Sequence, residues 1–433
     1  MSGERTAGQV RRRHLADEAS RSLFVLPAVL VVVAAVLAEV VAEVDDRLSP
    51  GDLPGFLETT EDSARAILGA IAGGTITTAA VVLSFTLVAV QLASSQYSPR
   101  TLGRFLSDRF QQVVMGIVFG TFTYSIVVLR EVEQAGIDRA GPQLATAGAA
   151  VLAIAALLAV LASIDHTARS LQVESIAERV SEAAIVIARE RYRLLDGPPA
   201  PPAPVPEVPA EAFVVTARRT GWIQQLAEGA LAAGLPSGTT VVLLAGVGDH
   251  VAEGSPVARV WPTPPEVDRA RRLFDDSIDL GSTRTLQDDV GFGITQLVDI
   301  ANRALSPAVN DPYTAQEIVL RLTPLLAELA TRDLTLRPAE EHGCCVHPAP
   351  GWDLAAFLQL AVGSIRWHAR EQPDVLTTLV EQLAALRDLA ADPAPVEHEA
   401  RILLDELHRL APADAERIRR AAEGVGWGPV PGP

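Results

Sequence analysis

The amino-acid sequence predicts a membrane α-helical fold of four transmembrane helices, followed by an α+β cytoplasmic domain. Four apolar runs lie in the first 165 positions, and each is long enough to cross a bilayer, which takes about 20 residues. A segment with seven prolines in 14 residues, 196–209, follows them. After it come β-rich stretches and then a long series of helical patterns.

The predicted spans occupy residues 23–44, 66–93, 110–129 and 143–164 of a membrane domain that covers 22–165. The second span lies in an uncharged stretch of 34 residues, from Ala66 to Pro99. The third contains Gly116 and Gly120, and this four-residue spacing predicts the close approach of another helix.

Arginine counts predict the orientation of the spans. The N-terminal segment, 1–21, has five arginines, the link 94–109 has three, and five more lie between Arg169 and Arg193. The two other loops are rich in acidic residues. Because positively charged loops stay in the cytoplasm, we expect a multi-pass protein of the cell (plasma or inner) membrane with both termini cytoplasmic.

Beyond the membrane domain the sequence predicts five further regions. They are a helical stalk (166–195), a proline-rich linker (196–210), a small β module (211–264), a mostly helical domain (265–424) and a flexible tail (425–433). The turn glycines of the β module are typical of a barrel-sandwich fold.

The composition excludes several functions. A net charge of −17 argues against binding of nucleic acid, which needs clustered cations. The chain has no lysine, so it has neither a lipoyl or biotinyl attachment site nor a Schiff-base nucleophile. His342, Cys344, Cys345 and His347 lack the spacing of a zinc site. We therefore expect no metal, no cofactor and no catalytic residue, and an enzyme is the third choice.

Two blocks of sequence carry a resemblance to a known family. The first runs from Thr75 to Arg100, and the second comprises Arg284–Asp288 and Phe292–Ala315. Both resemble a bacterial family of predicted membrane proteins known as domain of unknown function 2254. The resemblance implies a four-span N-terminal domain and a cytoplasmic C-terminal domain. It supplies no activity, substrate or catalytic residue.

Polar side chains recur along the second predicted span. Thr77, Ser84 and Gln91 are seven apart and therefore lie close to one helix face. This candidate polar transmembrane face comprises Thr77, Thr78, Ser84, Gln91 and Ser95. It predicts either packing against another helix, which is favoured, or the lining of a water-filled path.

A candidate cytoplasmic collar follows that span. It comprises Gln96, Ser98, Arg100 and Arg104. Arginines beside hydroxyls can bind phosphate or an anionic lipid headgroup, although arginines also serve simply to keep a loop in the cytoplasm. The two interpretations are equally weighted.

The second family block contains a candidate polar site. Its members are Arg284, Asp288, Asp299, Arg303, Asn310 and Asp311. Arginine beside a helix N-terminus can bind an anion. The favoured alternative is structural: Asp299 and Arg303 are spaced to pair along a helix, and Asn310 or Asp311 caps the next one.

Two functions remain open. The first is a channel-like or transport-associated protein, expected to be a homo-oligomer because four helices per chain seldom enclose a conduit, with the cytoplasmic domain as gate or assembly unit. The second is a membrane-anchored sensor or scaffold whose cytoplasmic domain binds a protein or an anionic ligand.

Overall fold

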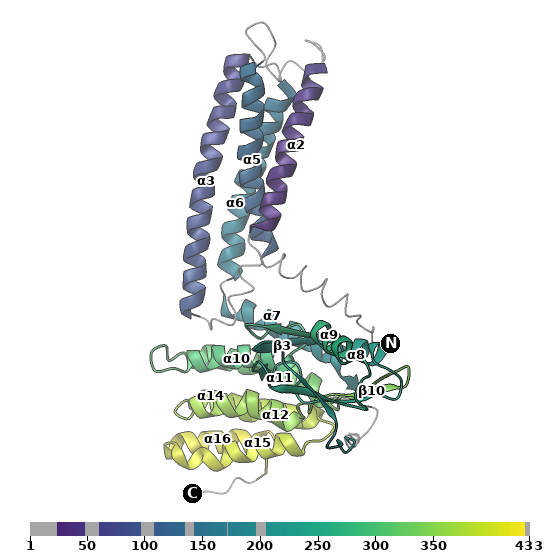
Figure 1. The fold of residues 1–433 in the computed structure, drawn as a ribbon. Coiled ribbons are helices and arrows are strands. Elements are labelled where there is room, and N and C mark those ends of the chain that lie inside the picture. Colours follow the sequence, from purple (N-terminus) through teal and green to yellow (C-terminus); the bar gives the residue numbers. More distant parts are fainter. Residues whose placement is uncertain are drawn as a thin grey trace. The chain divides into compact units, whose positions relative to one another are not determined.

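The computed structural model describes residues 24–47, 60–96, 108–134, 143–170, 172–195 and 205–428. They form two compact units, divided between Gln172 and Val173. We call the first the membrane unit and the second the C-terminal unit, and Figure 1 shows the helices and strands of each.

The membrane unit contains four helices that are long and apolar enough to cross a membrane, as predicted. They are α2 (Val25–Arg47), α3 (Glu61–Gln96), α5 (Arg109–Gln134) and α6 (Gln143–Ser170). Each continues beyond its predicted span. Helix α5 packs against the other three and is the most buried of the four.

The glycine pair of α5 packs against α2. A Cβ atom at Gly116 would lie 2.9 Å from Cβ of Leu30 and closer still to its Cδ1. One at Gly120 would lie 3.3 Å from Cβ of Ala34. The partner of this small-residue face is therefore a helix of the same chain, which can approach closely because both side chains are absent.

Near both ends of α5, polar contacts join this helix or the residue before it to a neighbouring helix of the membrane unit. Arg130 on α5 binds Glu39 on α2 at 2.6 Å. Near the start of α5, Asp108 contacts His166 of α6, with 2.7 Å between Oδ2 and Nε2. These contacts connect helix termini, where charged groups can reach the polar boundary of a bilayer.

Strands of the C-terminal unit form three sheets, with orders β2-β6-β4-β10-β9, β5-β3-β7 and β1-β8. The strands are β1 (Arg193–Leu194), β2 (Phe213–Thr216), β3 (Gly221–Leu226), β4 (Thr240–Leu243), β5 (His250–Val251), β6 (Pro256–Trp261), β7 (Ile278–Gly281), β8 (Arg332–Asp333), β9 (Ala339–Glu341) and β10 (Cys344–His347). Among the described residues these sheets form no closed barrel, so the predicted barrel-sandwich fold is not confirmed.

The β module also extends beyond the predicted 211–264. Strand β10 lies parallel to β4, with Val346 opposite Val241, although about 100 residues separate them. Strand β7 joins β3. Helices α8 (Glu228–Gly234) and α9 (Val267–Ser277) contribute Leu231 and Phe274 to the core of this part.

The remaining helices share one hydrophobic core. They are α7 (Val173–Arg191), α10 (Val290–Ala304), α11 (Pro312–Ala330), α12 (Leu354–Leu358), η2 (Gln359–Gly363), α13 (Ser364–His368), α14 (Pro373–Leu389), α15 (Ala394–Asp405), η3 (Glu406–Arg409) and α16 (Pro412–Gly424). The predicted helical content of 265–424 is present, although strands β7 to β10 interrupt it.

Two regions differ from the sequence prediction. The expected stalk is not a free continuation of the fourth span: α6 ends at Ser170, and the separate helix α7 buries Ala184 and Ala188 in the core. Small side chains on one face of α7 allow this packing. The expected tail is anchored up to Trp427, whose Nε1 donates to the carbonyl of Val380 at 3.1 Å.

Candidate functional site

The hydroxyl groups of the predicted transmembrane face bond to their own helix. Thr77 donates to the carbonyl of Gly73 at 2.8 Å, and Thr78 and Ser84 make the same contact four residues back, at 2.8 and 2.9 Å. Thr77, Ser84 and Gln91 are exposed on α3, and Thr78 is half-buried. The hydroxyl donors therefore need no partner from another helix.

The rest of the predicted face and collar lies outside the described side chains. The backbones of Ser95 and Gln96 belong to α3. Ser98, Arg100 and Arg104 lie outside the described residues.

Buried polar groups in the membrane unit were missed by sequence reasoning. Gln111 is buried, and its Nε2 donates to Oγ1 of Thr86 on α3 at 2.9 Å. Gln112 is also buried. The two adjacent glutamines at the start of an apolar run were the available signal, but the partner of Gln111 lies 25 residues away on another helix.

The six residues of the predicted polar site do not lie together. Arg284 and Asp288 precede the N-terminus of α10. Asn310 and Asp311 follow its C-terminus, so the 15 residues of α10, about 22 Å of helix, separate the two groups. Asp299 and Arg303 lie on α10 itself.

The structural interpretation, in which Asn310 or Asp311 caps the next helix, is confirmed for Asp311. Asp311 is the N-cap of α11 and accepts hydrogen bonds from the backbone and hydroxyl of Thr314, at 3.1 and 2.6 Å. These bonds lower the pKa of the Asp311 carboxyl. Asn310 adopts a φ of 50°, and its Oδ1 accepts a bond from Gln372 at 2.8 Å.

A polar cavity of about 70 Å³ lies at the other end of α10. It is formed where the last turn of α7 meets the starts of α8 and α10 and the loops 246–249 and 349–352. Its charged and aromatic wall comprises Arg191, Tyr192, Glu228, Asp249, Arg284, Asp288, Asp289, Trp352 and Phe357.

A buried ion pair closes one side of this cavity. The guanidinium of Arg284 donates to both carboxylate oxygens of Asp289, each at 2.9 Å. Their side chains are 18% and 7% exposed. Asp289 is also the N-cap of α10 and accepts from the backbone of Phe292 at 2.9 Å. Burial raises the pKa of the Asp289 carboxyl, whereas Arg284 acts to lower it.

Gly248 allows the loop before β5 to approach this ion pair. Its φ is +91°, a conformation that favours glycine. A Cβ atom there would lie 2.6 Å from Oδ2 of Asp289 and 3.1 Å from Nη2 of Arg284. The loop backbone therefore forms part of the wall only because this position has no side chain.

Arg191 and Glu228 face the same cavity from α7 and α8. Within the described residues no hydrogen bond or ion pair joins Glu228 to another side chain. Burial raises the pKa of its carboxyl, and the nearby charge of Arg191 opposes that effect. Burial also raises the pKa of Tyr192, next to Arg191. A carboxyl and a guanidinium that are not paired with each other can each bind a ligand.

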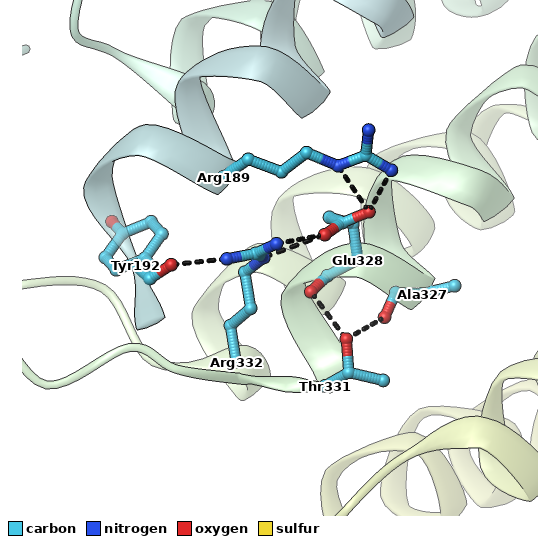
Figure 2. A network of polar contacts seen from close by, with 6 residues as sticks. All are labelled: Arg189, Tyr192, Ala327, Glu328, Thr331 and Arg332. Carbon is cyan, nitrogen blue, oxygen red and sulfur yellow. Dashed lines mark hydrogen bonds and ion pairs between the residues drawn. The ribbon is translucent and has the colours of Figure 1, made fainter. Parts of the chain in front are cut away.

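An ion-pair network fixes the end of α7 that carries these residues. Figure 2 shows Glu328 of α11 between two arginines. Arg189 donates to Oε2 at 3.0 and 2.8 Å, and Arg332 donates to Oε1 at 2.8 and 2.5 Å. Arg332 also donates to the backbone carbonyl of Tyr192 at 2.5 Å. The network therefore holds Tyr192, and with it Arg191, at the cavity.

We expect Glu328→Gln to destabilise the C-terminal unit by about 1–3 kcal/mol at pH 7, because charge-assisted bonds are lost. Hydrogen bonds from Arg189 lower the pKa of Glu328 below its ordinary 4.5. The unfolded state then binds more protons, so this contribution is complete above the ordinary pKa and is lost as the pH falls through the lower pKa of the folded state. All five tryptophans lie in the C-terminal unit, so tryptophan fluorescence during urea unfolding measures this unit selectively.

The variant should therefore lose less stability than the wild type between pH 5 and pH 3. Glu253→Gln, at an exposed position, is the control and should follow the wild type at every pH. If the unfolding free energies of Glu328→Gln and the wild type changed in parallel with pH, the assigned role of this network would be contradicted.

Comparisons with known proteins identify the family. Residues 20–385 match the family model described as predicted membrane protein (DUF2254). The chain belongs to the DUF2254 family. Two relatives of this DUF2254 protein are the uncharacterized proteins Rv1290c of Mycobacterium tuberculosis (strain H37Rv) and Mb1321c of Mycobacterium bovis. Each is 32% identical over 408 residues, which cover 89% of this chain and 75% of the relative. No solved structure matches the chain.

Proposed function

We propose that this DUF2254 protein is a membrane-anchored sensor whose C-terminal unit binds a small polar ligand. The observation that supports this function is the cavity shared by α7, α8 and α10. A concave site with a few convergent charged groups of perturbed pKa is the default position for a ligand.

The chain connection supports a signalling role for α7. Helix α6 ends at Ser170, and α7 begins at Val173 and ends at Arg191, on the cavity wall. One helix of 19 residues thus leads from the last membrane helix to the candidate site. A ligand that binds Arg191 more tightly in one position of α7 than in another would favour that position. On this proposal the C-terminal unit is cytoplasmic, because arginines flank the membrane helices on that side.

The test is a thermal-shift screen of the full-length protein in detergent, read by tryptophan fluorescence. Amino acids, sugars, carboxylates, phosphate and amines are supplied singly at pH 7. We expect at least one compound to raise the midpoint, since a ligand at 100 times its Kd stabilises by about 2.7 kcal/mol. The shift should disappear in Glu228→Gln and remain in Glu253→Gln. No shift with any compound, or an equal shift in both variants, would refute the proposal.

A channel-like homo-oligomer is the second candidate function. It is favoured by the exposed positions of Thr77, Ser84 and Gln91 on one helix of the membrane unit. It is weakened by the intrahelical hydrogen bonds of Thr77 and Ser84, which leave neither hydroxyl donor in need of water. Ion or solute flux in proteoliposomes that falls in Ser84→Val would favour the channel over the sensor.

A further inference from the structure

The ligand class follows from which charges on the cavity wall are already neutralised. Arg284 and Asp289 satisfy each other through two hydrogen bonds. Asp249 accepts a bond from the backbone of Gly246 at 2.8 Å, which holds its own loop. These groups build the wall and are not free to bind a ligand without breaking it.

Arg191 and Glu228 differ from that pair. Arg191 contacts the side chain of Tyr192 but forms no ion pair among the described residues, and it lies near enough to Glu228 to affect its pKa. A guanidinium binds a carboxylate in a two-bond geometry, and the half-buried carboxylate of Glu228 is stabilised by a cationic or hydrogen-bonding partner. The same cavity therefore offers one site for an anionic group and one for a cationic group.

Size and surroundings restrict the ligand further. At about 70 Å³ the cavity encloses only a few heavy atoms. Trp352 lies on the wall and remains 41% exposed, so it can contact a substituent that extends toward solvent. A compact head group whose cationic and anionic groups are attached to the same carbon matches this arrangement better than a phosphate or a simple amine.

Resting on the function proposed above, we infer that the ligand is a free α-amino acid, with its carboxylate on Arg191 and its ammonium on Glu228. The side chain of the amino acid extends toward Trp352. No bond is made or broken, so the step is binding alone.

The test compares glycine with its two halves, acetate and methylammonium, by isothermal titration of the full-length protein in detergent at pH 7. Glycine carries both charged groups and each half carries one. We expect glycine to bind at least tenfold more tightly than either half. Arg191→Gln and Glu228→Gln should each weaken glycine binding at least tenfold. Arg272→Gln and Glu253→Gln, at exposed positions of the same unit, should leave it unchanged.

Unfolding followed by tryptophan fluorescence identifies variants that fail to fold. If Arg191→Gln fails to fold, Arg191→Lys, which keeps the charge, replaces it. Acetate or methylammonium binding as tightly as glycine would overturn the amino-acid assignment. The assignment would also be overturned if glycine did not bind and another compound of the screen bound in a way that depends on Glu228. Either of these two results would leave the proposed sensor function intact. Absence of binding by every compound would overturn the assignment and the sensor together.

Discussion

Asp289→Ala should cost the C-terminal unit about 3–5 kcal/mol of unfolding free energy. The substitution leaves the buried guanidinium of Arg284 without a partner, and loss of one member of a buried ion pair has costs of this size. It also removes the N-cap of α10, which contributes about 1 kcal/mol by itself. Urea unfolding followed by tryptophan fluorescence measures the change.

Asp311→Ala is the matched control, because Asp311 caps α11 in the same way but has no arginine partner among its hydrogen bonds. We expect it to cost about 1 kcal/mol. Equal losses in the two variants would mean that the ion pair beside the cavity adds nothing beyond a helix cap.

Gly116→Leu should disrupt the membrane unit. The added side chain would overlap Leu30, and overpacking of this kind costs about 1–3 kcal/mol or displaces the helix. Gly73→Leu on α3 is the control, because no atom beyond the neighbouring backbone of its own helix lies within 4 Å of its Cβ position. The loss of helical circular dichroism on heating in detergent reports both units, and tryptophan fluorescence reports only the C-terminal one.

In Gly116→Leu, the membrane unit should lose its helical circular dichroism at a lower temperature than in the wild type. Tryptophan fluorescence should not report this transition, because all the tryptophans lie in the C-terminal unit. Combining Gly116→Leu with Leu30→Ala should restore part of the loss, because that change removes the overlapping carbons. An equal effect of Gly116→Leu and Gly73→Leu would contradict the packing of α5 on α2.

The membrane helices could be predicted from sequence because an uninterrupted apolar run of about 20 residues is typical of a membrane-spanning helix. The cap at Asp311 was also readable, since an aspartate before Pro312 is a local signal. The pairing of β10 with β4 could not be predicted, because two parallel strands that are distant in the chain produce no repeating pattern in the sequence. The role of α7 was misjudged because its small, alanine-rich face is equally compatible with an isolated helix.

The candidate site could be predicted only in part. Arg284 and Asp288 were selected, and both line the cavity. Asp289 was passed over, although it directly precedes the first turn of α10 and is therefore its cap. Arg191 and Glu228 stand on other helices, in segments whose local patterns predict only a stalk and a β module. Their convergence is a property of the tertiary fold.

The most direct test of the proposed ligand site is a structure of the full-length protein in lipid, determined with the tightest ligand found in the screen. We predict ligand density in the C-terminal unit that contacts both Arg191 and Glu228. Density at another position, with the cavity between α7, α8 and α10 unoccupied at saturating ligand, would contradict the assignment of this cavity as the ligand site.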